Sequence, residues 1–244
     1  MKLVGDSLIP LYQQVIDDIR QGIEDGRYEV GQKIPSESEL SELYSVSRIT
    51  IRRAIEELSA SGYLTKKQGK GTYVNPPKIM KKVLQTSPAQ SFSSICKAAG
   101  RVPGARLIQR EVGFPTSREA VLLGIGERVE VMAIRRVRTA DGIPISFETL
   151  ILPLEEFSYL LDEDLNDVSF YETLARHGAR KPAGMPMHTW MELIRASNEL
   201  AELLEVSVGE PLFDEVGVFS DEDGKPLFLG HSRIVASMFC FSMW

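Results

Sequence analysis

The chain is poor in the residues on which most enzyme and metal sites are built. Its 244 residues contain two cysteines and three histidines. Cys96 and Cys240 form no Cys-x-x-Cys pair, and His177, His188 and His231 are isolated from one another. The sequence therefore predicts no disulfide framework, no metal site and no cofactor. It also lacks a nucleophile elbow and a phosphate-cradling glycine loop, so we expect no catalytic residues.

Long apolar runs are also absent. None approaches the roughly 18 residues that a membrane helix needs, and the N-terminal segment MKLVGDSLIP has no signal-peptide core. We therefore expect a cytoplasmic protein without a membrane partner. An apolar fraction of 43% and a charged fraction of 25% are ordinary for a globular protein of this length.

The charge is distributed unevenly along the chain. The net charge is −6 overall, but residues 45–82 alone carry +7, whereas residues 1–44 carry −5 and residues 83–244 carry −8. A local positive patch is what phosphate neutralisation requires, whatever the sign of the whole chain. The pattern indicates a nucleic-acid-binding segment at residues 45–82.

That segment reads as a capped helix followed by a short hairpin. Ser47 is a good N-cap, apolar residues from Ile51 recur at spacings of four and three, and Gly62 suits the helix end. Residues 63–65 and 72–74 resemble two strands joined by a turn at 69–71. Two further helices are predicted before this segment. The first runs from residue 11 to about 26, and the second begins at a capping box formed by Ser36 and Glu39. Three helices and a two-stranded wing predict a winged helix-turn-helix.

Three segments then carry a family resemblance: PSE at 35–37, VSRITIRRA at 46–54 and QGKGTYV at 68–74. Together they resemble the DNA-binding domain of the GntR family of bacterial transcription regulators. The resemblance implies that the partner is a double-stranded DNA operator. It also implies DNA-binding roles for Ser36, Glu37, Ser47, Arg48, Thr50, Arg52, Arg53, Gln68, Gly69 and Lys70.

Two residues of this region, Arg53 and Ser38, need separate comment. Arg53 precedes Glu56 and Glu57, so an ion pair within the helix explains it as well as a DNA contact does. Many relatives have an arginine after Pro-Ser-Glu that contacts a base, and this chain has Ser38 instead.

The remainder of the chain has a different pattern of predicted secondary structure. Residues 76–87 read as a linker that Pro76-Pro77 begins, and Asp141-Gly142 and Asp223-Gly224 mark two hairpins. Hairpins with interspersed helices predict an α+β domain around an antiparallel sheet. We therefore expect a DNA-binding domain at 1–75, a linker at 76–87, and a separate α+β domain at 88–244.

Three motifs stand out in the C-terminal half: Arg136-x-Arg138 before Ala-Asp-Gly, Glu148, and Ser169-Phe-Tyr171. With these motifs, the C-terminal half resembles the UTRA effector-binding domain of the HutC subfamily of GntR regulators. The resemblance implies a chorismate-lyase-like fold that binds a small molecule, and thus an effector-binding and dimerisation domain at 88–244. On a strand, Arg136 and Arg138 face the same side, so they suit a phosphate or carboxylate. The expected effector-binding residues are Ser91, Phe92, Ser93, Arg136, Arg138, Glu148, Ser169, Tyr171, His231 and Arg233.

The resulting hypothesis is a homodimeric repressor that a small anionic metabolite releases from DNA. Two alternatives remain open at this point. One is a DNA-binding protein that responds to no ligand, and the other is an enzyme on the chorismate-lyase-like fold. The pair of arginines could also belong to a surface hairpin and pair only with Glu148 and Asp141.

Overall fold

The chain forms two compact units, Met1–Lys78 and Ile79–Trp244. The structure is a computed structural model that describes residues 8–82, 90–184 and 186–242. Residues 79–82 form a strand of the second unit, whereas we expected them within a linker. The end of that expected linker, at 83–87, lies outside the described residues.

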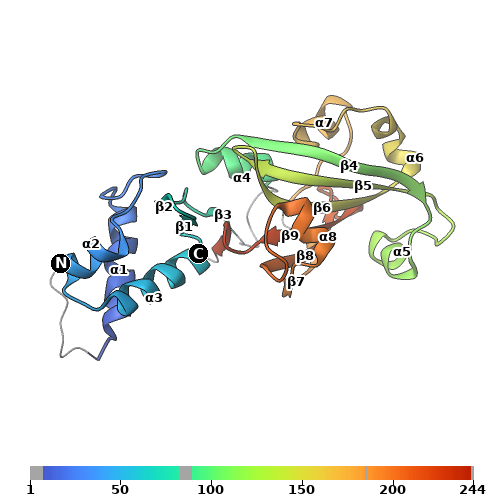
Figure 1. The fold of residues 1–244 in the computed structure, drawn as a ribbon. Coiled ribbons are helices and arrows are strands. Elements are labelled where there is room, and N and C mark those ends of the chain that lie inside the picture. Colours follow the sequence, from blue (N-terminus) through green and yellow to red (C-terminus); the bar gives the residue numbers. More distant parts are fainter. Residues whose placement is uncertain (1–7, 83–89, 185, 243–244) are drawn as a thin grey trace. The chain divides into compact units, whose positions relative to one another are not determined.

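The first unit is the winged helix-turn-helix that the sequence predicts. Its two wing strands pair antiparallel, with Leu64 opposite Val74. The elements, shown in Figure 1, are the helices α1 (Leu11–Glu24), α2 (Glu37–Tyr44) and α3 (Arg48–Ala60) and the strands β1 (Leu64–Lys67) and β2 (Gly71–Val74).

Local signals define the ends of these helices. Ser36 and Glu39 form a complete capping box at the start of α2, and the Ser47 side chain accepts from the Thr50 amide at the start of α3. Gly62 follows α3 with φ of 78°, the left-handed conformation that favours glycine after a helix. The three helices and the wing enclose one apolar core, which includes Val15, Leu40, Ile51, Leu58, Leu64 and Val74.

The second unit is built around one antiparallel sheet of six strands in the order β4-β5-β6-β9-β8-β7. An α+β domain around an antiparallel sheet is thus confirmed. A separate, parallel two-stranded sheet joins β3 (Ile79–Lys82) to β10 (Phe239–Ser242). The large sheet consists of β4 (Pro103–Gly113), β5 (Val131–Ala140), β6 (Ile143–Pro153), β7 (Met187–Arg195), β8 (Pro211–Ser220) and β9 (Pro226–Val235).

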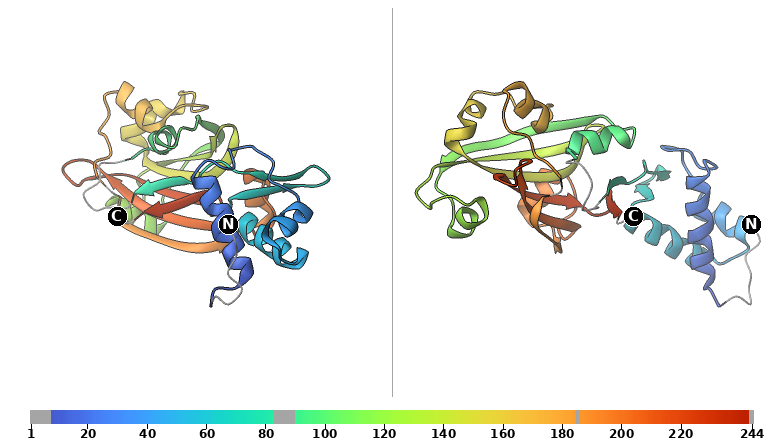
Figure 2. Two further views of the ribbon diagram at one scale, coloured as in Figure 1. Left: turned by 90° about the vertical axis from the view of Figure 1, so that its left-hand side faces the viewer. Right: turned by 180° about the vertical axis from the view of Figure 1, so that it is seen from behind.

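Short helices cover both faces of this sheet (Figures 1 and 2). The face that carries Ile134, here named the arginine face, packs against α4 (Phe92–Ala98), α6 (Leu154–Phe157), the 3-10 helix η1 (Ser158–Leu161) and α7 (Phe170–Arg176). The opposite face packs against α5 (Ser117–Leu123) and α8 (Asn198–Leu204). Both faces are therefore largely buried.

Within the described ranges, no helix is long and apolar enough to cross a membrane. The same part of the chain holds no group of three or more His, Cys, Asp or Glu residues that could bind a metal ion.

Candidate DNA interface and effector cavity

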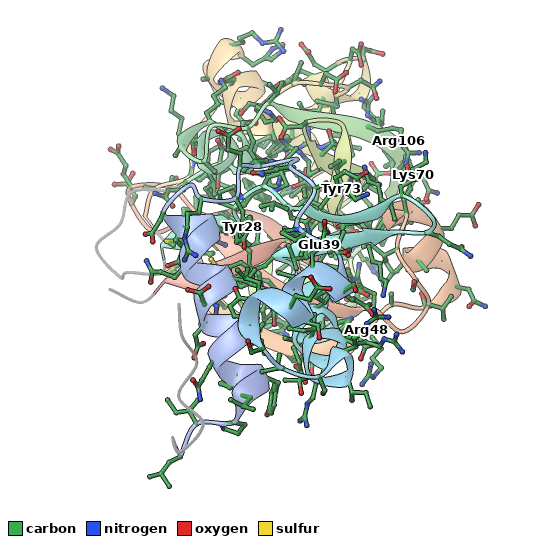
Figure 3. The ribbon with its side chains drawn as sticks, turned by 60° about the vertical axis from the view of Figure 1, so that its left-hand side comes forward. Tyr28, Glu39, Arg48, Lys70, Tyr73 and Arg106 are labelled. Carbon is green, nitrogen blue, oxygen red and sulfur yellow. The ribbon has the colours of Figure 1, made fainter. Side chains whose placement is uncertain are left out.

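The positive helix α3 presents its first turn to solvent. Ser47 ends the preceding turn in an extended conformation, and its hydroxyl lies 2.9 Å from the Thr50 hydroxyl. Arg48 and Arg52 are exposed, while Ile51 and Ile55 are buried. Figure 3 shows Arg48 on this helix and Lys70 on the hairpin that forms the wing.

Contacts from α2 hold both arginines in place. Arg48 Nη2 donates to Ser38 Oγ at 2.7 Å, so the serine that replaces the common arginine is a hydrogen-bond acceptor here. Arg52 donates through Nε and Nη2 to Glu37 Oε2, at 3.2 Å each. Lys66, on strand β1, donates to the other oxygen of Glu37 at 3.0 Å. Glu37 thus links the recognition helix to the wing.

The electrostatics of Glu37 agree with this bracing role. The hydrogen bond from Lys66, and then that from Arg52, hold the pKa of Glu37 below its ordinary value against the opposing effect of partial burial. The carboxylate is therefore ionised at neutral pH. All three side chains remain partly exposed, at 60% for Arg52, 56% for Lys66 and 24% for Glu37, so these ion pairs can open when phosphate approaches.

The remaining predicted DNA-binding residues lie at the wing tip, in the capping box of α2 and on the side of α3 that meets α1. Gln68, Gly69 and Lys70 are exposed at the wing tip, where Gly69 has φ of 71°. Ser36 uses its hydroxyl and its amide in the capping box with Glu39. Arg53 stacks over the Tyr12 ring, with its guanidinium carbon 3.8 Å from the ring centroid. Instead of an ion pair within α3, Arg53 makes a cation–π contact to α1.

In the second unit, one row of polar side chains crosses the arginine face. Arg136 on β5 pairs with Glu148 on β6, which pairs with Ser232 on β9, which in turn pairs with Glu215 on β8. Register partners point to the same side of a sheet. All four residues line one cavity, here named the arginine cavity.

A buried charge cluster forms one end of this row. Arg136 is 0% exposed and donates from Nε to Glu148 Oε1 at 2.8 Å. Its Nη2 lies 2.5 Å from the same oxygen but makes no hydrogen bond of acceptable geometry to any described residue. Arg138, 3% exposed, is 3.5 Å from that oxygen and also donates to Ser93 Oγ at 3.0 Å and to the Gly104 carbonyl at 3.2 Å.

The cluster holds more positive than negative charge. Burial lowers the pKa of Arg136, and Arg138 lowers it further, although Glu148 acts in the opposite direction. Burial alone would raise the pKa of Glu148, but the two guanidiniums outweigh burial and hold that pKa below its ordinary value. One carboxylate therefore serves two guanidiniums, which leaves an excess positive charge beside the cavity.

Most of the other predicted effector-binding residues lie around this cluster. Ser91 caps α4 and, with Phe92, lines the arginine cavity, and Phe92 has the Arg138 guanidinium 4.7 Å from its ring centroid. Tyr171 lines the same cavity, and burial raises the pKa of its hydroxyl, which therefore stays protonated. Ser169 caps α7 and lines an adjoining hollow beside Arg138 and Ser93.

The structure does not bring His231 and Arg233 to this cluster. On β9 the cavity-lining residues are Phe228, Gly230, Ser232 and Ile234, and successive residues of a strand alternate between faces. His231 instead bonds to Asp214 at 2.7 Å and lines a hollow on the opposite face, next to Trp190. Arg233 pairs with the same carboxylate at 3.1 Å. Burial and the nearby Arg233 lower the pKa of His231.

Several cavity residues were not predicted. Ser146 and Phe170 line the arginine cavity, as does the ion pair in which Lys81 on β3 contacts Glu215 at 2.6 Å. The Lys81 and Glu215 side chains are only 14% and 12% exposed. Lys81 stands in a lysine-rich segment near the positive patch. Its partner Glu215 is distant in the sequence, so no local signal indicated the pair.

Comparison with known families identifies both units. Residues 11–74 match the model of the bacterial regulatory proteins of the gntR family, and residues 98–239 match the UTRA domain. The HTH-type transcriptional repressor NagR of Bacillus subtilis is 32% identical over 87% of this chain and 85% of its own length. A probable fructoselysine utilization operon transcriptional repressor of Escherichia coli K12 is 30% identical over 93% of this chain and 87% of its own.

A more distant relative and a solved structure are also similar to this chain. The histidine utilization repressor of Pseudomonas putida is 29% identical over 85% of this chain and 81% of its own length. The crystal structure of PhnF from Mycobacterium smegmatis covers 96% of this chain and 98% of its own, with a TM-score of 0.65 and 23% identity, and thus shows the same fold. These relatives are transcriptional regulators and not enzymes, which sets aside the enzyme alternative.

Proposed function

The chain belongs to the GntR family of transcription regulators and carries a UTRA effector domain, and from this premise we propose that it is a repressor released from DNA by a small anionic metabolite. Acting in the cytoplasm, two subunits pair through their second units and present two winged helices to the half-sites of a near-palindromic operator. Ligand in the arginine cavity changes the second unit, and the segment after Pro76-Pro77 passes the change to the DNA-binding units. Ligand and DNA then alter each other's affinity by the same factor.

The observation that carries the proposal is the excess positive charge in the arginine cavity. Arg136 and Arg138 are almost fully buried and share one carboxylate, Glu148. An anionic group supplies the missing negative charge and the hydrogen-bond acceptors that guanidiniums require. Sugar phosphates, phosphonates and small carboxylates all satisfy this requirement. A surface hairpin with merely solvated arginines does not account for their burial.

On the DNA side, the proposal rests on exposed cations at the start of α3 and at the wing tip. Arg48, Arg52 and Lys70 are exposed, and the bracing of Arg52 by Glu37 holds its guanidinium in a defined direction before DNA arrives. Preorganisation of this kind reduces the entropy that is lost on binding.

A thermal-shift screen of the purified protein tests the ligand proposal. The panel contains sugar phosphates, phosphonates and small carboxylates such as urocanate, because a ligand that binds only the native state raises the melting temperature. We expect a hit that Arg138→Ala abolishes while operator binding persists. Arg135→Ala is the matched control, since Arg135 is the adjacent arginine on β5 and pairs with the exposed Glu111 instead. If no compound in the panel shifts the melting temperature although DNA is bound, the ligand-independent alternative is favoured.

A further inference from the structure

An isoleucine projects from the first turn of the recognition helix. Ile49 is 81% exposed, among the highest values for large apolar side chains in the described chain. It follows Arg48, the first residue of α3, and stands three residues before Arg52. Covering such a side chain with an apolar partner group is favourable, because it removes apolar surface from water. In a helix that otherwise presents arginines to a polyanion, the residue invites a specific explanation.

The position of Ile49 on the helix is the most outward one of that turn. The buried face of α3 consists of Ile51, Ala54, Ile55 and Leu58. With about 100° of rotation per residue, Ile49 lies roughly opposite the mean direction of these four side chains. The helix that packs its buried face on the domain core therefore directs Ile49 straight away from it.

Neighbouring contacts leave Ile49 prominent. The guanidinium of Arg48 is drawn to Ser38 and that of Arg52 to Glu37, and both acceptors belong to α2. On the other flank, Arg53 turns over the Tyr12 ring of α1. The arginines on both sides thus lean toward other helices, and the aliphatic side chain projects between them.

The chemistry of the major groove offers one partner for such a side chain. Base edges there present hydrogen-bond donors and acceptors, which an isoleucine cannot use, and the C5-methyl group of thymine, which it can. Residues at the N-terminal end of a recognition helix are those that reach base edges. We infer that Ile49 contacts the methyl group of one thymine in each operator half-site and thereby selects that base. This inference rests on the proposed operator binding.

The test begins with a randomised double-stranded DNA library, from which the full chain selects its preferred sequence. Each thymine of the selected site is then replaced singly by deoxyuridine, which removes the methyl group and keeps the base pair. We expect one thymine per half-site whose replacement weakens binding about fourfold, the worth of one buried methyl-sized group. If no thymine in the selected site is sensitive to loss of its methyl group, the inference is overturned.

Variants assign the effect to the side chain. Ile49→Ala removes most of the apolar surface and should bind the thymine and deoxyuridine sites equally, whereas Ile49→Val should keep most of the preference. Leu43→Ala is the matched control, because Leu43 is another exposed aliphatic residue of the same unit, 60% exposed on α2. An unchanged preference in Ile49→Ala overturns the assignment. Failure of the library to yield any enriched sequence instead overturns the proposed operator binding itself.

Discussion

Replacing Glu148 by glutamine should destabilise the second unit strongly. The substitution keeps the size of the side chain and removes its charge, which leaves Arg136 and Arg138 without a counterion. These side chains are 0% and 3% exposed, and Glu148 Oε1 lies 2.8 Å from Arg136 Nε. Removing one partner of a buried ion pair costs about 3–5 kcal/mol. That loss is a large share of the roughly 5–15 kcal/mol that stabilises a typical domain.

Urea unfolding followed by tryptophan fluorescence measures this change in the correct unit. Trp190 packs against a core cluster of the second unit, and residues 1–78 contain no tryptophan, so the signal does not come from the DNA-binding unit. Glu111→Gln is the matched control, because Glu111 pairs with Arg135 at 3.0 Å while the two side chains are 46% and 36% exposed. An exposed pair of this kind is worth at most about 1 kcal/mol.

Added phosphate extends the same experiment. In the Glu148→Gln variant an anion can take the place of the missing carboxylate, so inorganic phosphate should raise the midpoint of unfolding more in the variant than in the parent protein. A variant that unfolds within about 0.5 kcal/mol of the parent would refute the reasoning, because it would show that the two guanidiniums do not depend on Glu148.

The remaining predictions concern DNA binding and pH. Arg52→Ala should weaken binding to the selected operator by about 1–3 kcal/mol, the usual worth of a bidentate base contact, as measured by fluorescence anisotropy; undiminished specific binding would remove Arg52 from the recognition surface. Because the pKa of Glu148 lies below its ordinary value of 4.5, its carboxylate stabilises the folded unit fully above that pH and loses this effect as the pH falls through the lowered pKa. The difference in unfolding free energy between the parent and Glu148→Gln should therefore be largest near neutral pH and should shrink toward pH 3. If the difference in unfolding free energy is undiminished at pH 3, the stabilising role of the ionised Glu148 carboxylate is contradicted.

Local signals in the sequence were enough to predict much of the fold. Ser47 and the capping box at Ser36 define helix starts through hydrogen bonds between residues three positions apart, so a short stretch of sequence contains the whole interaction. The turn at Asp141 and Gly142, with φ of 53° and 78°, likewise defines the β5–β6 hairpin. That hairpin in turn places Glu148 opposite Arg136.

Long-range pairings were not accessible in this way. The parallel pairing of β3 with β10 joins residues near opposite ends of the second unit, and neither strand carries a turn signal toward the other. On β9, Leu227, Phe228 and Leu229 are all buried, at 0%, 1% and 6% exposure, because helices cover both faces of the sheet. The strand therefore lacks the alternation that would have shown which face His231 and Arg233 occupy.

The pairing of β3 with β10 also sets an order of events during protein synthesis. The winged helix-turn-helix is complete once residue 78 has left the ribosome, and domains emerging first generally fold first. Strand β3 follows at once but has no partner until residues 239–242 are made, and Lys81 on β3 meets Glu215 only after most of the second unit exists. A nascent chain thus acquires its DNA-binding unit long before its UTRA domain. A chain whose synthesis is interrupted would contain a DNA-binding unit without the domain that is proposed to control it.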